Sequence, residues 1–573
     1  MLYTSRLREL LLRKKIISKQ NIELHLKAAQ KEGISLEAYL LKHKILTEEK
    51  LYSAVASYFK LPFIKLKDLA VRKDILFLVP EVIANTHKIV AFDKKENVIK
   101  LAITNPDDIQ TMEFIAKKTG LQPELSIALP TEINEYLKQY RLSLKAEFQE
   151  ITTRPKRIED KKKLQELAEN LPIVRIVDSL LEHAIFEGAS DIHIEPLEKE
   201  VVIRYRVDGI LRKVMSLPKT VHPGIIARIK ILSNLKLDEH RLPQDGRFKI
   251  ETKEYKISFR VSMMPIFDGE KVVMRLLNES AKPLSLEDLG LLTKPLAIVR
   301  RNIKRPHGII LVTGPTGSGK TTTLYSIMHL LNKPEVNIST FEDPVEYRMP
   351  GINQSQVNPK IDFTFAKGLR ALLRQDPDII MVGEIRDPET AEIATNAAMT
   401  GHLVLSTLHT NDAATTLPRI GDMGIPPFLI SFTANMIIAQ RLVRKICKEC
   451  KEKHKLEKEE IAQAEALFNT KDIFSSLLKQ KYLKAGYNLK NISFYRGAGC
   501  QKCGNTGYKG RIGIYEVLEI TPTMKELINK KADALQIAKT AKELGMITLV
   551  MDGFIKAIKG ETSLEEIIRV TKE

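Results

Sequence analysis

The stretch LVTGPTGSGKTTT, residues 311–323, constrains the fold of this chain more than any other feature. Its pattern G-x-x-x-x-G-K-T matches a Walker A phosphate-binding loop. An apolar run precedes the loop and a helix-forming run follows it, which is the strand-loop-helix context that such a loop needs. The chain is therefore predicted to contain an α/β domain in which a doubly wound sheet carries this loop.

Each residue type in the loop has a physical task. Glycines let backbone N–H groups converge on phosphate oxygens, Lys320 would reach the β- and γ-phosphates, and the Thr321 hydroxyl would ligate Mg²⁺. The predicted nucleotide-binding residues are Gly314, Pro315, Thr316, Gly317, Ser318, Gly319, Lys320, Thr321 and Thr322.

Two further strands are expected to bring carboxylates to the same edge of the sheet. The segment NISTFEDPVEY ends in three acids, of which Glu346 is the last, and DIIMVGEIRD carries Glu384 near its end. Ligands of a doubly wound sheet bind at the carboxyl ends of its strands, so both acids should lie beside the phosphate loop. Hydrolysis needs one carboxylate for metal-bound water and one for the attacking water.

A third strand, in GHLVLSTLHTND, is expected to bring His402 and His409 to this region. A single histidine is more commonly a surface or core residue. The neighbouring motifs favour a functional role for both, and the structural alternative stays open.

The only four cysteines form two C-x-x-C pairs, Cys447 with Cys450 and Cys500 with Cys503. Such a pattern predicts a zinc site, and four thiolates leave no open coordination position, so the zinc would be structural. Disulfides are disfavoured in a reducing cytosol. Unligated thiols are the remaining alternative.

These blocks resemble the motifs of the secretion ATPases that drive type II secretion and type IV pilus assembly. GPTGSGKTTT resembles the Walker A motif of that family, EDPVEY its aspartate box, LRQDPDIIMVGEIRD its Walker B motif and TGHLVLSTLHTNDA its histidine box. The likeness extends over nearly the whole chain. It implies a multidomain α/β protein, with a RecA-like P-loop ATPase core preceded by a PAS-like α/β domain and by helical and α/β N-terminal domains.

The resemblance also implies roles for residues outside the loop. Glu346 resembles the water-activating glutamate of the family, and Glu384 resembles the Walker B acid that supports the metal. His402 and His409 resemble the histidine-box pair, which links nucleotide state to subunit arrangement.

Arginine fingers are expected from the preceding domain. Arg204 and Arg206 alternate with Tyr205 and so share one face of a predicted strand. They are the first candidates, and Arg260 and Arg275 are the next. A solvated strand face is the alternative interpretation.

The long N-terminal region and the cysteines favour one branch of the family. Retraction ATPases that resemble this chain lack both features, so pilus assembly is the first expectation and type II secretion the second. The resemblance implies a homohexamer in the bacterial cytoplasm, peripheral to the inner membrane. Its expected partners are an inner-membrane platform protein and accessory proteins at the N-terminal domains. Related repeats bind cyclic di-GMP where a glycine stands, but this chain has Arg8 and Glu37 there, so no binding is expected.

Periodicity and composition divide the chain into segments. An internal repeat aligns residues 6–28 with residues 35–57, and Ser18 and Thr47 are placed to cap helices. The predicted domains are a helical module (1–60), a small α/β domain (61–142), a charged linker (143–171), the PAS-like domain (172–283) and the ATPase domain (284–573), with a tetracysteine subdomain at about 440–515.

The chain is basic, with 90 Lys and Arg against 71 Asp and Glu. This excess fits a solvated lysine-rich surface, an anionic membrane surface or nucleic acid. A nucleic-acid translocase is disfavoured because the charged tracts lack interleaved aromatics and the chain has no Trp. The most apolar segment, PFLISFTANMIIAQ (427–440), is too short to span a membrane and is expected to be a packed helix. The charged residues near the N-terminus argue against a signal peptide.

Overall fold

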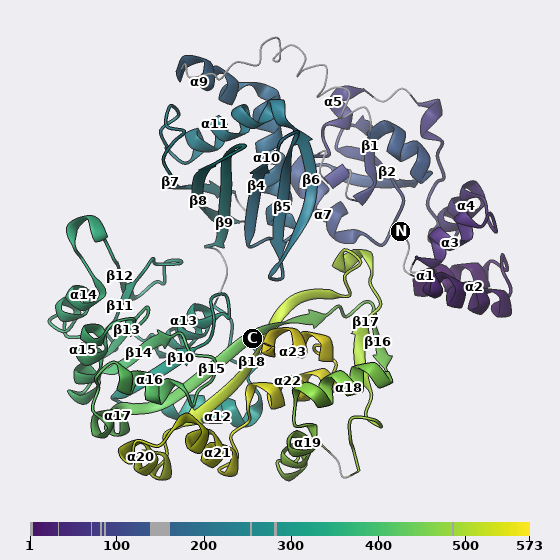
Figure 1. The fold of residues 1–573 in the computed structure, drawn as a ribbon. Helices are drawn as coiled ribbons and strands as arrows, with labels where there is room; N and C mark the ends of the chain where they lie inside the picture. The colour runs from purple at the N-terminus through teal and green to yellow at the C-terminus, as the bar shows by residue number, and fades with distance from the viewer. Residues whose placement is uncertain are drawn as a thin grey trace. The chain divides into compact units, whose positions relative to one another are not determined.

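The computed structural model describes residues 4–32, 34–69, 72–80, 83–84, 87–137, 161–252, 255–279, 283–483 and 486–572. It comprises two compact units, Met1–Leu277 with Cys500–Lys502, and Asn278–Gly499 with Cys503–Glu573. Figure 1 colours the chain from purple at the N-terminus to yellow at the C-terminus. Among the described residues, no helix has both the length and the apolar character needed to cross a membrane.

The first unit begins with the repeated helices. Ser18 precedes the second of them and accepts a hydrogen bond from the Asn21 amide, and Thr47 caps the fourth by accepting from the Lys50 amide. The caps therefore form where the sequence predicted them. The helices are α1 (Thr4–Arg13), α2 (Lys19–Lys31), α3 (Leu36–Lys42) and α4 (Glu48–Phe59).

A small three-stranded sheet of order β1-β2-β3 follows, with one antiparallel and one parallel pair. Asp108 caps its helix α7 by accepting from the Thr111 amide, and Gly120 ends that helix in the left-handed conformation. The elements are η1 (Leu66–Asp68), α5 (Lys73–Leu76), β1 (Ile89–Lys95), β2 (Val98–Ile103), α7 (Ile109–Thr119) and β3 (Gln122–Ile127).

Residues 143–160 of the predicted linker lie outside the described residues. Its last part differs from the prediction, because Lys161–Glu169 forms helix α9, which packs against α11 (His222–Leu232). Ala168 of α9 is fully buried in a small cluster with Ala227 and Leu237. This contact gives the charged segment an apolar partner that its own composition does not provide.

The rest of the first unit is a six-stranded sheet of order β6-β5-β4-β9-β8-β7, with α10 (Leu171–Phe186) and α11 contributing to the same hydrophobic core (Figure 1). The strands are β4 (Asp191–Pro196), β5 (Glu200–Val207), β6 (Ile210–Pro218), β7 (Gln244–Glu251), β8 (Lys256–Ile266) and β9 (Gly269–Asn278), and η2 is Lys219–Val221.

The second unit is built on a seven-stranded sheet of order β12-β11-β13-β14-β10-β15-β18. Its strands are parallel except β18, which runs antiparallel to β15. Ile309 and Leu311 enter one core while Ile310 and Val312 enter another, so both faces of the sheet are covered. The strands are β10 (Gly308–Thr313), β11 (Ile338–Glu342), β12 (Ile352–Gln356), β13 (Ile379–Val382), β14 (Leu403–Leu408), β15 (Ala434–Ile446) and β18 (Tyr508–Glu519).

The segment 427–440 is not a single helix as expected. Helix α17 (Pro427–Thr433) ends after one half, and the second half begins strand β15. Strand β15 lies between β10 and β18 and is buried on both faces, which explains its continuous apolar run. The other helices around the sheet are α12 (Thr293–Asn302), α13 (Lys320–Leu331), η3 (Pro359–Ile361), α14 (Phe365–Leu372), α15 (Pro388–Met399) and α16 (Thr416–Asp422).

The segment between the two cysteine pairs begins with a strand. Strand β16 (Lys451–His454) pairs with β17 (Phe494–Gly497), and the helices α18 (Lys458–Leu467) and α19 (Thr470–Lys479) lie between them in the sequence. The short helix η4 is Gln501–Cys503, and the chain ends with α20 (Pro522–Asn529), α21 (Ala534–Glu543), α22 (Leu549–Ile558) and α23 (Leu564–Thr571).

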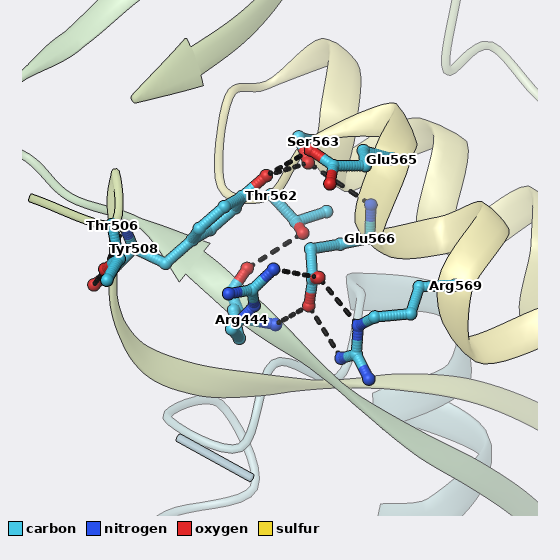
Figure 2. Close-up of polar contacts among 8 residues, drawn as sticks. All are labelled: Arg444, Thr506, Tyr508, Thr562, Ser563, Glu565, Glu566 and Arg569. Carbon is cyan, nitrogen blue, oxygen red and sulfur yellow. Dashed lines mark hydrogen bonds and ion pairs between the residues drawn. The ribbon is translucent and has the colours of Figure 1, made fainter. Parts of the chain in front are cut away.

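Figure 2 shows how the last helix is attached to the sheet. The buried Glu566 carboxylate accepts from the Arg444 guanidinium at 2.6 Å and from Arg569 at 2.8 Å. Burial acts to raise the pKa of Glu566, but the hydrogen bonds from Arg569 and Arg444 outweigh it and lower the pKa to about 2. The Tyr508 ring covers the Arg444 guanidinium at 4.0 Å and its hydroxyl contacts Ser563 Oγ at 2.6 Å.

Candidate active site

The phosphate loop connects β10 to α13, as the sequence predicted. Gly314 has a φ of +144°, and a Cβ atom at this position would lie 2.4 Å from the Gln440 carbonyl oxygen. Glycine is therefore required there by the close approach of β15. Thr321 and Thr322 are exposed at the start of α13, where a ligand can reach them.

Lys320 points back over the loop. Its Nζ donates to the Gly314 carbonyl at 2.7 Å and to the Pro315 carbonyl at 3.3 Å. Burial lowers the pKa of Lys320, and the Glu384 carboxylate opposes that shift. The ammonium group is thus held at the loop, and a bound phosphate would offer it stronger acceptors than two carbonyl oxygens.

A buried Glu342 organises the segment that carries Glu346. The Tyr325 hydroxyl donates to Glu342 Oε2 at 2.5 Å and accepts from the Glu346 amide at 3.3 Å. Thr340 Oγ1 donates to Glu342 Oε1 at 2.6 Å. Burial raises the pKa of Glu342. Glu342 is therefore a structural acid, whereas the Glu346 side chain is only half-buried.

Glu384 lies just after β13 and connects the Walker B strand to the histidine-box loop. Its Oε1 accepts from Arg386 at 2.6 Å, and its Oε2 lies 3.4 Å from His409 Nε2. Thr313, at the end of β10, meets the same loop through a 2.6 Å contact between its hydroxyl and that of Thr410. The loop after β14 is thus joined to both the Walker A and the Walker B strands.

The structure does not place His402 with His409. The register pairs Gly308 with Leu403, so His402 precedes β14 at the amino edge of the sheet, whereas the phosphate loop follows β10 at the carboxyl edge. Its Nδ1 contacts the Ala397 carbonyl at 2.9 Å. Strand β14 (Leu403–Leu408) thus separates His402 from His409, and the expected role of this pair at a nucleotide stays a prediction.

The candidate arginine fingers belong to the first unit, where each is already paired. Arg204 donates to Glu195 at 2.6 Å, and Arg206 lies 3.4 Å from Asp191. Arg275 also contacts Asp191, at 3.1 Å. Arg204 and Arg206 lie on β5 on either side of the buried Tyr205, so they share a half-exposed face as expected.

The four cysteines form one cluster, in which the ligand atoms all lie within 4.8 Å of one another. The Sγ atoms of Cys450 and Cys503 are 3.9 Å apart, close to the separation of about 3.8 Å that a tetrahedral site with Zn–S bonds of about 2.3 Å requires. The Gly507 amide donates to Cys503 Sγ at 3.3 Å. Gly497 and Gly507 pack backbone against backbone here, since a Cβ on Gly497 would lie 2.0 Å from the Gly507 carbonyl oxygen.

Sequence reasoning missed two residues of the site. Tyr325 on α13 holds the Glu346 segment, and Gln440 on β15 contacts the phosphate loop. One feature of the sequence indicated Gln440, because this amide directly follows the apolar run MIIA. No feature of the sequence indicated Tyr325, because it lies within an ordinary helical pattern.

Known proteins resemble this chain over most of its length. The family model described as type II/IV secretion system protein matches residues 166–569, and the MshEN domain matches residues 59–147. The type IV pilus assembly ATPase PilB of Myxococcus xanthus is 40% identical over 577 residues, which cover 99% of this chain and 98% of that protein. The type II secretion system ATPase E of Vibrio cholerae is 47% identical over 410 residues, which cover 72% of this chain and 77% of that protein. The solved structure of the ATPase DotB from Yersinia pseudotuberculosis shares the fold, with a TM-score of 0.51 and 22% identity over 70% of this chain and 93% of that one.

Proposed function

Because this chain belongs to the type II/IV secretion system protein family, we propose that it is a motor ATPase that drives type IV pilus assembly. The single observation that carries the proposal is the similarity to PilB, which continues through the N-terminal region. The match to the type II secretion ATPase is higher in identity but covers only 72% of the chain, so type II secretion is the second candidate.

ATP would bind at the loop between β10 and α13. Lys320 would leave the Gly314 and Pro315 carbonyls and bind the β- and γ-phosphates, and the exposed Thr321 hydroxyl would hold Mg²⁺. An ion held there would supply positive charge that offsets the negative charge developing during phosphoryl transfer.

Two acidic residues would have different tasks in hydrolysis. Glu346, held by Tyr325 through its backbone, would orient the attacking water and accept its proton. Glu384 would support the metal through water. Its contact with His409 would couple the state of the phosphates to the conformation of the loop after β14. Arg204 or Arg206 would stabilise the transferring phosphoryl group after leaving Glu195 or Asp191.

Zinc at the four cysteines would be structural. In the sequence, Cys447 and Cys450 lie between β15 and β16, and Cys500 and Cys503 lie between β17 and β18. A closed thiolate site at this position would hold the C-terminal part of the ATPase unit together without taking part in hydrolysis.

The working form would be a homohexamer in the bacterial cytoplasm, bound to the inner membrane through a platform protein. Rigid-body movement between its parts would convert hydrolysis into motion of that platform. Accessory proteins would bind the N-terminal domains. Cyclic di-GMP is not expected as a ligand of the helical repeats, because Glu37 is buried and accepts from the Tyr52 hydroxyl at 2.6 Å.

The proposal is tested by capture of the cytosolic domains of inner-membrane proteins on the purified full-length chain, with ATP and without it. Recovery of a pilus platform protein, changed by ATP, is the expected result. Recovery of a type II secretion platform instead would move the function to the second candidate. Salt-dependent stimulation of hydrolysis by DNA or RNA, with no platform bound, would replace both with a nucleic-acid translocase.

A further inference from the structure

Three ligand-type side chains converge in the first unit, far in sequence from the cysteines. They are His87, which precedes β1, and His183 and Glu187, which lie on α10 and at its end. Their ligand atoms all lie within 4.8 Å of one another. Neither the hydrolysis chemistry nor the secretion motifs use any of these residues.

Three of the four ring nitrogens of the two histidines are buried without a hydrogen-bond partner among the described residues. Within the described part of the chain, His87 Nε2 and both ring nitrogens of His183 have no hydrogen-bond partner. The His183 side chain is only 2% exposed. Buried polar atoms of this kind are rare, and a missing ion is one of their ordinary explanations.

Asp108 fixes which nitrogen of His87 faces the cluster. Its Oδ2 lies 2.6 Å from His87 Nδ1, so Nδ1 carries the hydrogen and donates it to the carboxylate. In the neutral ring this leaves the lone pair on Nε2, which lies 3.7 Å from Glu187 Oε1. A carboxylate that orients the far nitrogen of a histidine is the usual second contact of a metal-bound imidazole.

The spacing suits an ion between the three groups. Glu187 Oε1 is 3.7 Å from His87 Nε2 and 3.8 Å from His183 Nε2, both too long for a hydrogen bond. Ligand bonds of about 2.0–2.1 Å in a tetrahedral site would separate the ligand atoms by about 3.4 Å. Small side-chain rotations would therefore bring all three atoms onto one ion.

The surroundings keep this arrangement in place. The Phe186 ring meets His87 edge-on at 5.6 Å and Phe114 of α7 at 5.0 Å, and together they form an apolar wall beside the cluster. Lys118 of α7 forms an ion pair with Glu182 of α10. These contacts position α10 against the small α/β domain.

We propose that His87, His183 and Glu187 form a second metal site, which binds one divalent transition-metal ion of the zinc type. Two imidazoles and one carboxylate are the donor set that zinc, cobalt and nickel accept, and a water molecule would complete the coordination. The ligands come from the small α/β domain and from α10, so the ion cross-links these two parts of the first unit. The ion would thereby stabilise the packing of α10 against the small α/β domain.

Zinc stoichiometry of the full-length chain tests the proposal. After removal of weakly bound metal by gel filtration, the wild type is expected to hold two zinc ions per chain, one at the cysteines and one at the new site. Glu187→Gln and His183→Gln are each expected to hold one. The matched control Asp178→Asn changes an exposed carboxylate on the same helix α10, outside the cluster, and is expected to hold two.

Cobalt separates the two sites spectroscopically. When the cysteines are already occupied by zinc, added Co²⁺ is expected to give visible d–d absorption without thiolate charge-transfer bands, in the wild type and in Asp178→Asn. Asp108→Asn keeps a side chain that caps α7, and it is expected to weaken binding about 10- to 100-fold by removing the carboxylate behind His87.

A wild-type chain that holds only one zinc ion would overturn the proposal, because no metal would then bind at His87, His183 and Glu187. A second zinc retained by Glu187→Gln would also overturn it, since the ion would then lie elsewhere. Glu187 is 34% exposed, so Glu187→Gln should fold. If circular dichroism shows that His183→Gln does not fold, the zinc content of Glu187→Gln alone decides between the outcomes.

Discussion

The side-chain amide of Gln440 donates a hydrogen bond of 2.7 Å to the carbonyl oxygen of Ser318, in the middle of the phosphate loop. The Gln440 Oε1 atom accepts from the Thr323 hydroxyl, also at 2.7 Å. One side chain of the neighbouring strand β15 thus holds both the loop and the first turn of α13. The loop is shaped for phosphate by this contact before any nucleotide binds.

Replacing Gln440 by Leu is therefore expected to weaken ATP binding. Two hydrogen bonds of about 0.5–1.5 kcal/mol each would be lost, which corresponds to an increase of about 5- to 150-fold in the dissociation constant. Equilibrium binding of a fluorescent ATP analogue measures the effect. Gln536→Leu on the exposed face of α21 is the control and should bind as the wild type does. Equal affinity in both variants would show that the loop keeps its shape without Gln440.

Glu346→Gln should bind ATP normally but hydrolyse it about 10²- to 10⁴-fold more slowly, because the amide cannot take a proton from water. Tyr325→Phe should cost about tenfold in kcat, since it removes only the hydroxyl that holds the Glu346 backbone. The double variant should be no slower than Glu346→Gln alone. Additive losses would mean that Tyr325 acts independently of Glu346.

The Glu566 cluster is expected to make the stability of the protein fall at acid pH. The folded-state pKa of about 2 lies below the ordinary glutamate value of 4.5, so the carboxylate stabilises the fold fully above pH 4.5 and progressively less toward pH 2. The difference corresponds to about 3 kcal/mol. Urea unfolding followed by circular dichroism should show that the free energy of unfolding of Glu566→Gln is lower than that of the wild type by about this amount at pH 7. The difference between the two proteins should become smaller below pH 4.5. Glu543→Gln, at an exposed position on α21, should match the wild type at both values.

Glu516 should show the opposite dependence. It is buried in β18 and accepts from the Ala413 amide at 2.9 Å, and burial raises its pKa to about 7. Its neutral form favours folding, so the stabilising contribution is complete below pH 4.5 and is lost as the pH rises through 7. Glu516→Gln is expected to be more stable than the wild type at pH 8, by up to about 3 kcal/mol, and equal to it near pH 4.5. A variant less stable at pH 8 would contradict this assignment.

Cys500→Ser should remove zinc from the cysteine cluster and destabilise the ATPase unit, because three thiolates hold the metal more weakly than four. Zinc released by a thiol-blocking mercurial should fall from one equivalent per chain to none. The thermal unfolding midpoint should fall with it. A chelator should reproduce the shift in the wild type. An unchanged midpoint in both experiments would show that the thiols are unligated.

The sequence alone determined the parts that depend on local spacing. The Walker A loop, the caps at Ser18 and Thr47 and the paired cysteines are each defined within a few residues, so their geometry follows from short-range chemistry. The order of the four motif blocks also indicated the family, because few arrangements of strands carry those blocks in that order.

Only the tertiary structure decided which residues meet across the chain. It divided segment 427–440 between a helix and a strand, because β15 is buried on both faces between β10 and β18. It separated His402 from His409, since the register of β14 places them at opposite edges of the sheet. It brought His87 to His183 from segments that share no pattern. Such contacts form because the burial of residues that are distant in the sequence offsets the loss of chain entropy. A local sequence pattern does not show which distant residue will be contacted.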